Sequence, residues 1–297
     1  MVEGRASGIL THSPTFDLGN VRVTRVSGGI NLLDGGGMNG ILPKPVWERW
    51  YPPDEKNRIV LETNCLVVET EDSVILIESG CGNKLSEKEK EFYVVEEGDW
   101  IGAHLLASGF SLDSFTQVIL THLHTDHCGG VVTRDESGAL VPTFSNARVA
   151  VPQPEHADAQ AGYGISPMAY NPANYEPLRE TDQLELLPPD AEITSRIHYV
   201  ATPGHTRGHQ SVLVRGDRLT LLFTGDLIPL ARHFVPHYNM AYEVDTVVKA
   251  KTKQAVLEKA HEAGWILLLS HEPYAPFCRV VRNEKRNRLE FAPWEGD

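Results

Sequence analysis

The feature of this 297-residue chain that most limits its fold is a set of short apolar runs that end near residues able to bind a metal. The runs are residues 117–121, 148–151, 219–223 and 265–269. His122, Asp226 and His271 follow the first, third and fourth of them. Runs of this length are typical of strands buried on both faces and covered by helices. Because sites in α/β sheets form beyond the carboxyl ends of strands, we expect these side chains to converge at one edge.

Other segments carry clear secondary-structure patterns. Alternating and β-branched residues predict strands at 21–26, 64–69 and 73–78. A helix is predicted over 245–262, where Lys249, Lys251, Lys253 and Lys259 among Val248, Ala255 and Ala260 give an amphipathic stripe, with Gly264 as its stop. Residues 279–282 and 288–291 predict a hairpin.

The chain has no internal repeat and no linker that would divide it, so we expect a single domain over residues 1–297. Two stretches, 35–57 and 155–179, are rich in Gly, Pro, Tyr and Asn and are interpreted as long ordered loops near the site. Loops of such length in a compact domain are usually functional. Trp47, Trp50 and Tyr51 in the first stretch either line an apolar substrate pocket or belong to the core.

Composition excludes several classes of partner. The 40 Asp and Glu against 27 Lys and Arg give a net charge of −13, which argues against nucleic acid and anionic membranes. The longest run of large apolar residues, 265–269, is too short to span a bilayer. Residues 1–14 lack the basic and apolar regions of a secretory signal, so we expect a cytoplasmic protein. A small-molecule substrate is expected, and a homodimer is a possible assembly.

The segment QVILTHLHTDHCGG, residues 117–130, carries the densest cluster of ligand-type side chains. His122 and His124 are two apart and point to the same side of an extended segment. Asp126 and His127 follow on a bend or the first turn of a helix. Imidazole and carboxylate ligands together suit Zn²⁺, Fe or Mn²⁺. Cys128 is interpreted as a packing residue rather than a ligand, and the four cysteines as free thiols.

Three later residues, His205, Asp226 and His271, also stand at apparent strand ends. Together with the first cluster they would suffice for two metals, with three histidines on one, an Asp and two histidines on the other, and one shared carboxylate. His209 is interpreted as a buried structural histidine near the site. His233 and His237 are assigned to a loop near the pocket mouth, where they are surface residues or contact substrate.

The motif His-x-His-x-Asp-His at 122–127, followed by His205, Asp226 and His271, resembles the metallo-β-lactamase-fold hydrolase superfamily over about residues 64–273. The resemblance implies an αββα sandwich, with two mixed β-sheets face to face and helices outside. It also implies two divalent metal ions, with Zn²⁺ expected and Fe or Mn²⁺ as alternatives. By similarity, the ligands of the first metal would be His122, His124 and His205, those of the second Asp126, His127 and His271, and the bridge Asp226.

Within the superfamily the chain is most similar to N-acyl-homoserine-lactone lactonases, through THLHTDHCGG, HTRGHQS and PTFSNARVAV. Two positions depart from their pattern. Pro229 stands where such lactonases have a tyrosine that assists ring opening, and Tyr242 is the candidate to supply a phenol instead. Glu78-Ser79-Gly80 replaces the usual Asp-x-Gly. His237 and Tyr242 are the candidate substrate contacts.

The expected reaction is hydrolysis of a lactone or a similar ester or amide by a hydroxide shared between two cations about 3.5–4 Å apart. Asp126 would orient this nucleophile and carry its proton to the leaving group. Phosphodiester or organophosphate hydrolysis is the main alternative, and the two long loops would decide between them. A β-lactamase is less expected, because the commonest class has a cysteine at the position of Asp226. A di-iron redox protein usually has a flavin domain, for which we expect no room after Asp297, and an inactive binding module would not need the full ligand set.

Overall fold

The computed structural model describes residues 13–165 and 169–296. The N-terminal segment tested above for a secretory signal, with His12, falls largely outside this part, as do residues 166–168 of the second predicted loop. Over the described ranges, every helix is too short or too polar to cross a bilayer.

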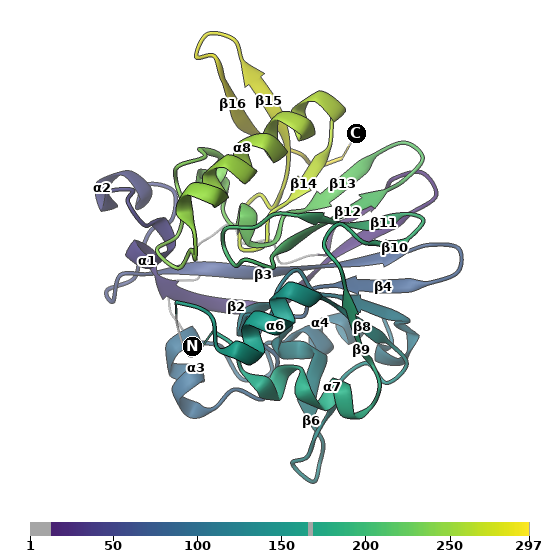
Figure 1. The fold of residues 1–297 in the computed structure, drawn as a ribbon. Helices are drawn as coiled ribbons and strands as arrows, with labels where there is room; N and C mark the ends of the chain where they lie inside the picture. The colour runs from purple at the N-terminus through teal and green to yellow at the C-terminus, as the bar shows by residue number, and fades with distance from the viewer. Residues whose placement is uncertain (1–12, 166–168, 297) are drawn as a thin grey trace.

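The first of two seven-stranded sheets is built from the N-terminal part of the chain (Figure 1). Neighbouring strands are antiparallel from β1 to β4 and parallel from β4 to β9. In spatial order the strands are β1 (Thr15–Asp17), β2 (Arg22–Asp34), β3 (Arg58–Glu69), β4 (Val74–Ile77), β5 (Gln117–Ile119), β8 (Arg148–Pro152) and β9 (Leu184–Leu187).

The second sheet also has seven strands and comes from the C-terminal part. All its neighbours are antiparallel except β13 and β14, which pair in parallel. The order is β10 (Glu192–Thr194), β11 (Ile197–Ala201), β12 (Gln210–Arg215), β13 (Thr220–Phe223), β14 (Ile266–Leu268), β15 (Phe277–Asn283) and β16 (Arg288–Pro293). A separate hairpin joins β6 (Val132–Arg134) to β7 (Leu140–Pro142).

The sheets pack face to face, and helices cover their outer faces (Figure 1). Leu66 and Ile75 of the first sheet pack with Leu221 and Phe223 of the second in one fully buried cluster. The outer face of the first sheet is covered by α4 (Ile101–Ala107), and that of the second by α8 (Thr246–Ala263). The predicted αββα sandwich is therefore confirmed, whereas the single domain over 1–297 stays a prediction.

The remaining helices are short. The α-helices are α1 (Gly35–Asn39), α2 (Lys44–Trp47), α3 (Glu87–Tyr93), α5 (Thr125–Cys128), α6 (Gln153–Ala161) and α7 (Glu176–Glu180). Short 3₁₀ helices are η1 (Leu112–Ser114), η2 (Gly129–Val131), η3 (Pro172–Asn174), η4 (Gly225–Leu227) and η5 (Ala231–Phe234).

The two predicted long loops contain helices. Residues 35–57 include α1 and α2, while 155–179 begins within α6 and ends within α7. Three of these helices carry proline in the first turn, namely Pro45 of α2, Pro154 of α6 and Pro177 of α7. Proline fits the start of a helix, where its missing N–H is not needed. Pro45 and Pro177, which were interpreted as loop residues, therefore lie in the first turns of helices.

The helix predicted over 245–262 is α8, and its ends are as expected. The Asp245 side chain accepts hydrogen bonds from Val247 N and Val248 N, and Gly264 adopts a left-handed conformation at the C-terminal end. The assignment of all four lysines to one polar stripe is wrong, because Lys249 and Lys253 are fully buried. Both find polar partners on segment 238–243, which helical periodicity does not reveal.

Candidate metal centre

The first ligand-type side chains follow β5 directly. His122 is fully buried and its Nδ1 lies 2.9 Å from Thr121 Oγ1. Its Nε2, also buried, has no hydrogen-bond partner among the described residues. The short helix α5 then carries Asp126 and His127. The backbone of Gly130, just after this helix, lies close to that of Ser79. A Cβ on Gly130 would be 2.2 Å from Ser79 O, so only glycine allows this approach.

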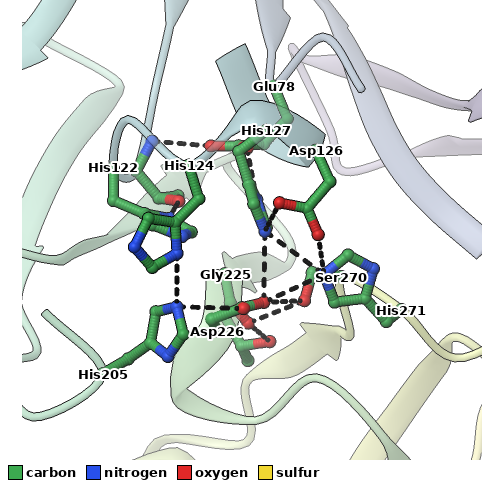
Figure 2. A network of polar contacts seen from close by, with 12 residues as sticks. Glu78, His122, His124, Asp126, His127, His205, Gly225, Asp226, Ser270 and His271 are labelled. Carbon is green, nitrogen blue, oxygen red and sulfur yellow. Dashed lines mark hydrogen bonds and ion pairs between the residues drawn. The ribbon is translucent and has the colours of Figure 1, made fainter. Parts of the chain in front are cut away.

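The second sheet supplies the other three side chains. Asp226 follows β13 and His271 follows β14, and the parallel pairing of these strands places both residues at the same edge. His205 lies in the connection between β11 and β12. The structure thus brings together all seven residues that the sequence analysis singled out as ligands (Figure 2). Three groups of possible ligand atoms lie within 4.8 Å of one another: His122, His124, His205; His122, His127, Asp226; and Asp126, His127, His271.

Asp226 stands between two sets of histidines. Its Oδ2 lies 3.2 Å from His205 Nε2, which is itself 3.0 Å from His124 Nδ1. Its Oδ1 lies 3.4 Å from His127 Nε2 and 3.2 Å from His271 Nε2. Each carboxylate oxygen therefore faces a different set (Figure 2).

The far nitrogens of three rings are engaged by acceptors. His127 Nδ1 lies 2.6 Å from Glu78 Oε2, and His205 Nδ1 lies 2.9 Å from Glu243 Oε2. His271 Nδ1 lies 2.9 Å from the backbone oxygen of Glu62. A neutral ring that donates through Nδ1 presents a lone pair at Nε2. These lone pairs converge on the Asp226 carboxylate, an arrangement suited to a cation.

The charges around Asp226 support the same conclusion. Burial would raise the pKa of Asp226, but His127, His271 and His205 hold it well below its ordinary value. Burial would likewise lower the pKa of His127, whereas Asp226 and Glu78 raise it. The buried carboxylate thus requires positive charge beside it, which protons supply in the chain alone and a divalent metal would supply when bound.

Glu78 occupies the position at which the sequence departs from Asp-x-Gly. Its Oε1 accepts a hydrogen bond from Thr121 N at 2.6 Å while Oε2 holds His127 Nδ1. Its backbone has φ of +67°, a left-handed conformation that is costly for glutamate. Through these two contacts Glu78 connects the end of β4 to the segment that carries His122 and His127.

A cavity of about 140 Å³ opens over the cluster. His124, Asp126, His205, Asp226 and His271 contribute to its lining. Its remaining lining is Leu33, Met38, Leu61, Phe92, Tyr93, Ile165, Ala169, Met240, Tyr242 and Val244. Each predicted loop contributes, and so does Tyr242, but Phe92 and Tyr93 of α3 and the neighbours of Tyr242, Met240 and Val244, were missed. The sequence of α3, EKEKEFY, is mostly charged, and its final aromatic pair, of which Tyr93 is buried, is the signal that could have pointed to the cavity.

The two candidate substrate contacts lie in different places. Tyr242 lines the cavity. His237 is exposed, its ring rests 4.7 Å from that of Tyr238, and it is not among the described lining residues. His233 is fully buried rather than in a surface loop at the pocket mouth. Phe234 beside it packs beneath α8, so the 3₁₀ turn η5 faces the core.

Burial also decides the roles of several aromatic, histidine and cysteine side chains. Trp47 and Tyr51 are core residues, whereas Trp50 is 38% exposed and stacks against Arg232. His209 is buried and accepts a hydrogen bond from Asp226 N at 3.0 Å, which confirms its structural role. Cys128 packs in the core of the first sheet, and all four cysteines are free.

With this geometry in place, comparison with known proteins identifies the class. A model of the metallo-beta-lactamase superfamily matches residues 58–271, and the chain belongs to this superfamily. An N-acyl homoserine lactonase of Bacillus cereus is 27% identical over 177 residues, which are 56% of this chain but only 63% of the lactonase. The chain thus spans less than two thirds of that relative's length.

Solved structures share the fold over nearly the whole chain. A probable metal-dependent hydrolase from Staphylococcus aureus superposes with a TM-score of 0.82 at 25% identity, covering 93% of this chain and 99% of that one. AidC, described as a dizinc quorum-quenching lactonase in complex with its product, gives a TM-score of 0.76 at 19% identity, with coverages of 95% and 97%. The latter likeness carries the fold alone.

Proposed function

We propose that the chain is a hydrolase that depends on two divalent cations, expected to be Zn²⁺, with Fe or Mn²⁺ as alternatives. The observation that carries this proposal is the Asp226 carboxylate, with one oxygen toward each set of histidines. The buried Nε2 of His122, which has no partner in the part of the chain that the structure describes, fits the same interpretation. One cation would be held by His122, His124 and His205, the other by Asp126, His127 and His271, with Asp226 between them.

Divalent cations held here would polarise a carbonyl oxygen and lower the pKa of water, so that hydroxide would be available as a nucleophile near neutral pH. The chain itself supplies a carboxylate to carry the proton, Asp126, and a phenol to bind the substrate, Tyr242. Asp126 lies 3.6 Å from His271 Nε2 and 3.9 Å from His127 Nε2, the longest contacts in the cluster, and it also lines the cavity. We assign it the role of accepting a proton and passing it to the leaving group.

Tyr242 is the proposed donor to the substrate in place of the tyrosine missing at Pro229. Burial, and then Asp34 and Asp126, raise the pKa of Tyr242, so the phenol keeps its proton and donates a hydrogen bond. Tyr242 and Asp126 line the same cavity. His237 remains a candidate only for a substrate large enough to extend beyond the cavity.

The proposed substrate is a lactone, or a similar ester or amide, with an apolar arm. The walls of the cavity are mostly aliphatic and aromatic, and no Lys or Arg is among the described residues that line it. A phosphodiester or organophosphate would gain little from such walls, which favours the carboxylic ester. The lactonase activity named for the Bacillus cereus relative supports the same class.

The test combines metal analysis with a substrate panel. Lactones with apolar acyl arms should be hydrolysed fastest, chelation should abolish turnover, and Zn²⁺ should restore it. The panel should include carboxyl esters, a β-lactam and phosphodiesters. Fast turnover of the phosphodiesters alone would overturn the proposal while leaving the metal centre in place. The cytoplasmic location and the homodimer stay predictions.

A further inference from the structure

We infer that Glu243 is a positioning residue that couples the metal centre to the wall of the substrate cavity. Its buried ion pair with Lys249 orients His205 and fixes the segment 238–245 at the same time. The metal-binding and substrate parts of this inference depend on the proposed function. The mechanical coupling between the two regions is a property of the chain and is tested separately.

Glu243 uses both carboxylate oxygens. Oε2 lies 2.9 Å from His205 Nδ1, on the far side of the ring from Asp226. Oε1 accepts a hydrogen bond from Met240 N at 2.9 Å and pairs with Lys249 Nζ. The side chains of Glu243 and Lys249 are both 0% exposed, so no solvent competes for these contacts.

The segment that Glu243 holds forms one wall of the cavity. Met240, Tyr242 and Val244 line the cavity, while Glu243 between them bonds to His205. The backbone repeats the connection, because Val244 N donates to His205 O at 3.1 Å. The wall is therefore joined to the ring of His205 by a side-chain hydrogen bond and to its backbone by a main-chain hydrogen bond.

The first turns of α8 restrict the movement of the segment that carries His205. Asp245 N donates to Gly204 O at 2.9 Å, and Lys249 N donates to Asp245 O at 3.0 Å. A Cβ on Gly204 would lie 2.4 Å from Lys249 Cβ and 2.5 Å from Lys249 Cα, so the helix rests directly on the residue before His205. A shift of His205 must then move Lys249 and the cavity wall.

Glu78 offers a matched control within the same chain. It too is a buried glutamate that engages the Nδ1 of a histidine in the cluster, here His127. Its second oxygen bonds Thr121 N rather than a residue of the cavity wall. Glu78→Gln therefore disturbs the centre to a similar degree without touching segment 238–245.

The experiment compares Glu243→Gln and Glu78→Gln with the wild type, using amide hydrogen exchange with and without chelator. In the wild type and Glu78→Gln, metal removal should raise exchange in segment 238–245. In Glu243→Gln exchange there should be high already and insensitive to chelator. Each variant should bind Zn²⁺ about 10–100-fold more weakly, as expected when an outer partner of a ligating histidine is lost. With lactones, only Glu243→Gln should raise KM more for long acyl arms than for short ones.

Glu243→Gln could fail to fold because Lys249 loses its charged partner. In that case the double variant Glu243→Gln/Lys249→Met, which removes both charges of the buried pair, replaces the single variant in the experiment. The inference would be overturned if the folded Glu243 variant, single or double, showed the same exchange response to chelator in segment 238–245 as the wild type. An equal change in acyl-length dependence for Glu78→Gln would overturn it as well. If the wild type hydrolysed no lactone, carboxyl ester or amide, the proposed function would instead be overturned, and the exchange comparison would still test the coupling.

Discussion

The hydroxyl oxygen of Tyr242 lies directly against Gly37: a Cβ on that glycine would be 2.0 Å from the oxygen and 2.7 Å from Cζ. The two segments are also joined by the backbone, since Ala241 N donates to Gly37 O at 2.8 Å. Gly37 N in turn donates to Asp34 Oδ1 at the start of α1. The missing side chain at position 37 thus leaves room for the phenol that lines the cavity.

Replacing Gly37 by Ala should displace the phenol of Tyr242. The end of a tyrosine side chain can move, and Ala favours helix, so the free energy of unfolding should change by no more than about 1 kcal/mol. Turnover of a lactone should fall to the level of Tyr242→Phe, measured as kcat/KM beside thermal melting. The double variant should lose no more than either single one. Unchanged kcat/KM in both single variants would remove Tyr242 from the reaction.

Asp126→Asn should keep most of the metal and lose most of the activity. The amide retains a coordinating oxygen but does not take up a proton, and general acid–base groups contribute about 10²–10⁴-fold. Metal content per chain and kcat should be measured on the same preparation. A metal-loaded variant that turns over at nearly the wild-type rate contradicts the role given to this carboxylate.

Lys84 should make stability depend on pH above neutrality. Burial lowers the pKa of Lys84 to about 8, although Cys128, Cys81 and Glu89 oppose the shift. The unfolded chain keeps this proton up to about pH 10.4 and so binds more protons than the folded chain from about pH 8 to that value. The contribution of Lys84 to the free energy of unfolding therefore rises with pH across this window. Below pH 8 the lysine is charged in the folded chain, and the destabilisation from burying that charge is fully present.

The measurement is denaturant unfolding of wild type and Lys84→Met at several pH values. Wild-type stability relative to the variant should increase by up to about 3 kcal/mol between pH 7 and pH 10.5. Lys88→Met, which removes an exposed lysine of the same segment, serves as the control for lost surface charge. A difference that stays constant with pH would show that Lys84 is charged in the folded chain throughout.

Removing the metal should destabilise the protein. With free cation at about a thousandfold excess over Kd, binding to the folded state alone adds about 4 kcal/mol. Thermal melting should therefore shift to lower temperature with chelator and recover after Zn²⁺ is added back. Identical melting curves in both conditions would mean that the cluster binds no cation tightly.

The site was predictable because its signals are local. His122 and Asp226 stand just beyond strands of uniform apolar character, and strand ends in such sheets meet at one edge. Glu243 and Lys249 carry no comparable signal. A glutamate two residues before a helix cap and a lysine in its second turn are usually solvated, and only contacts between distant segments reveal that these two are buried together.

The cavity was less predictable for a related reason. Phe92 and Ile165 belong to segments that are largely polar or irregular, and their shared surface depends on how α3 and the chain after α6 pack over the first sheet. Length and proline content identified residues 155–179 as important, yet Pro177 in that stretch begins α7. Local patterns fix where strands end, whereas cavity walls depend on packing between segments far apart in sequence.

The assignment of each sheet to a separate part of the chain has a consequence for when the metal centre can form during synthesis. The first sheet uses residues up to Leu187 and the second uses residues from Glu192 onward, so each is made from a separate half of the chain. His124 and His127 come from the first half, His205 and His271 from the second. Each cation would therefore cross-link the two halves. Synthesis must pass His205 before the first cross-link can form and His271 before the second.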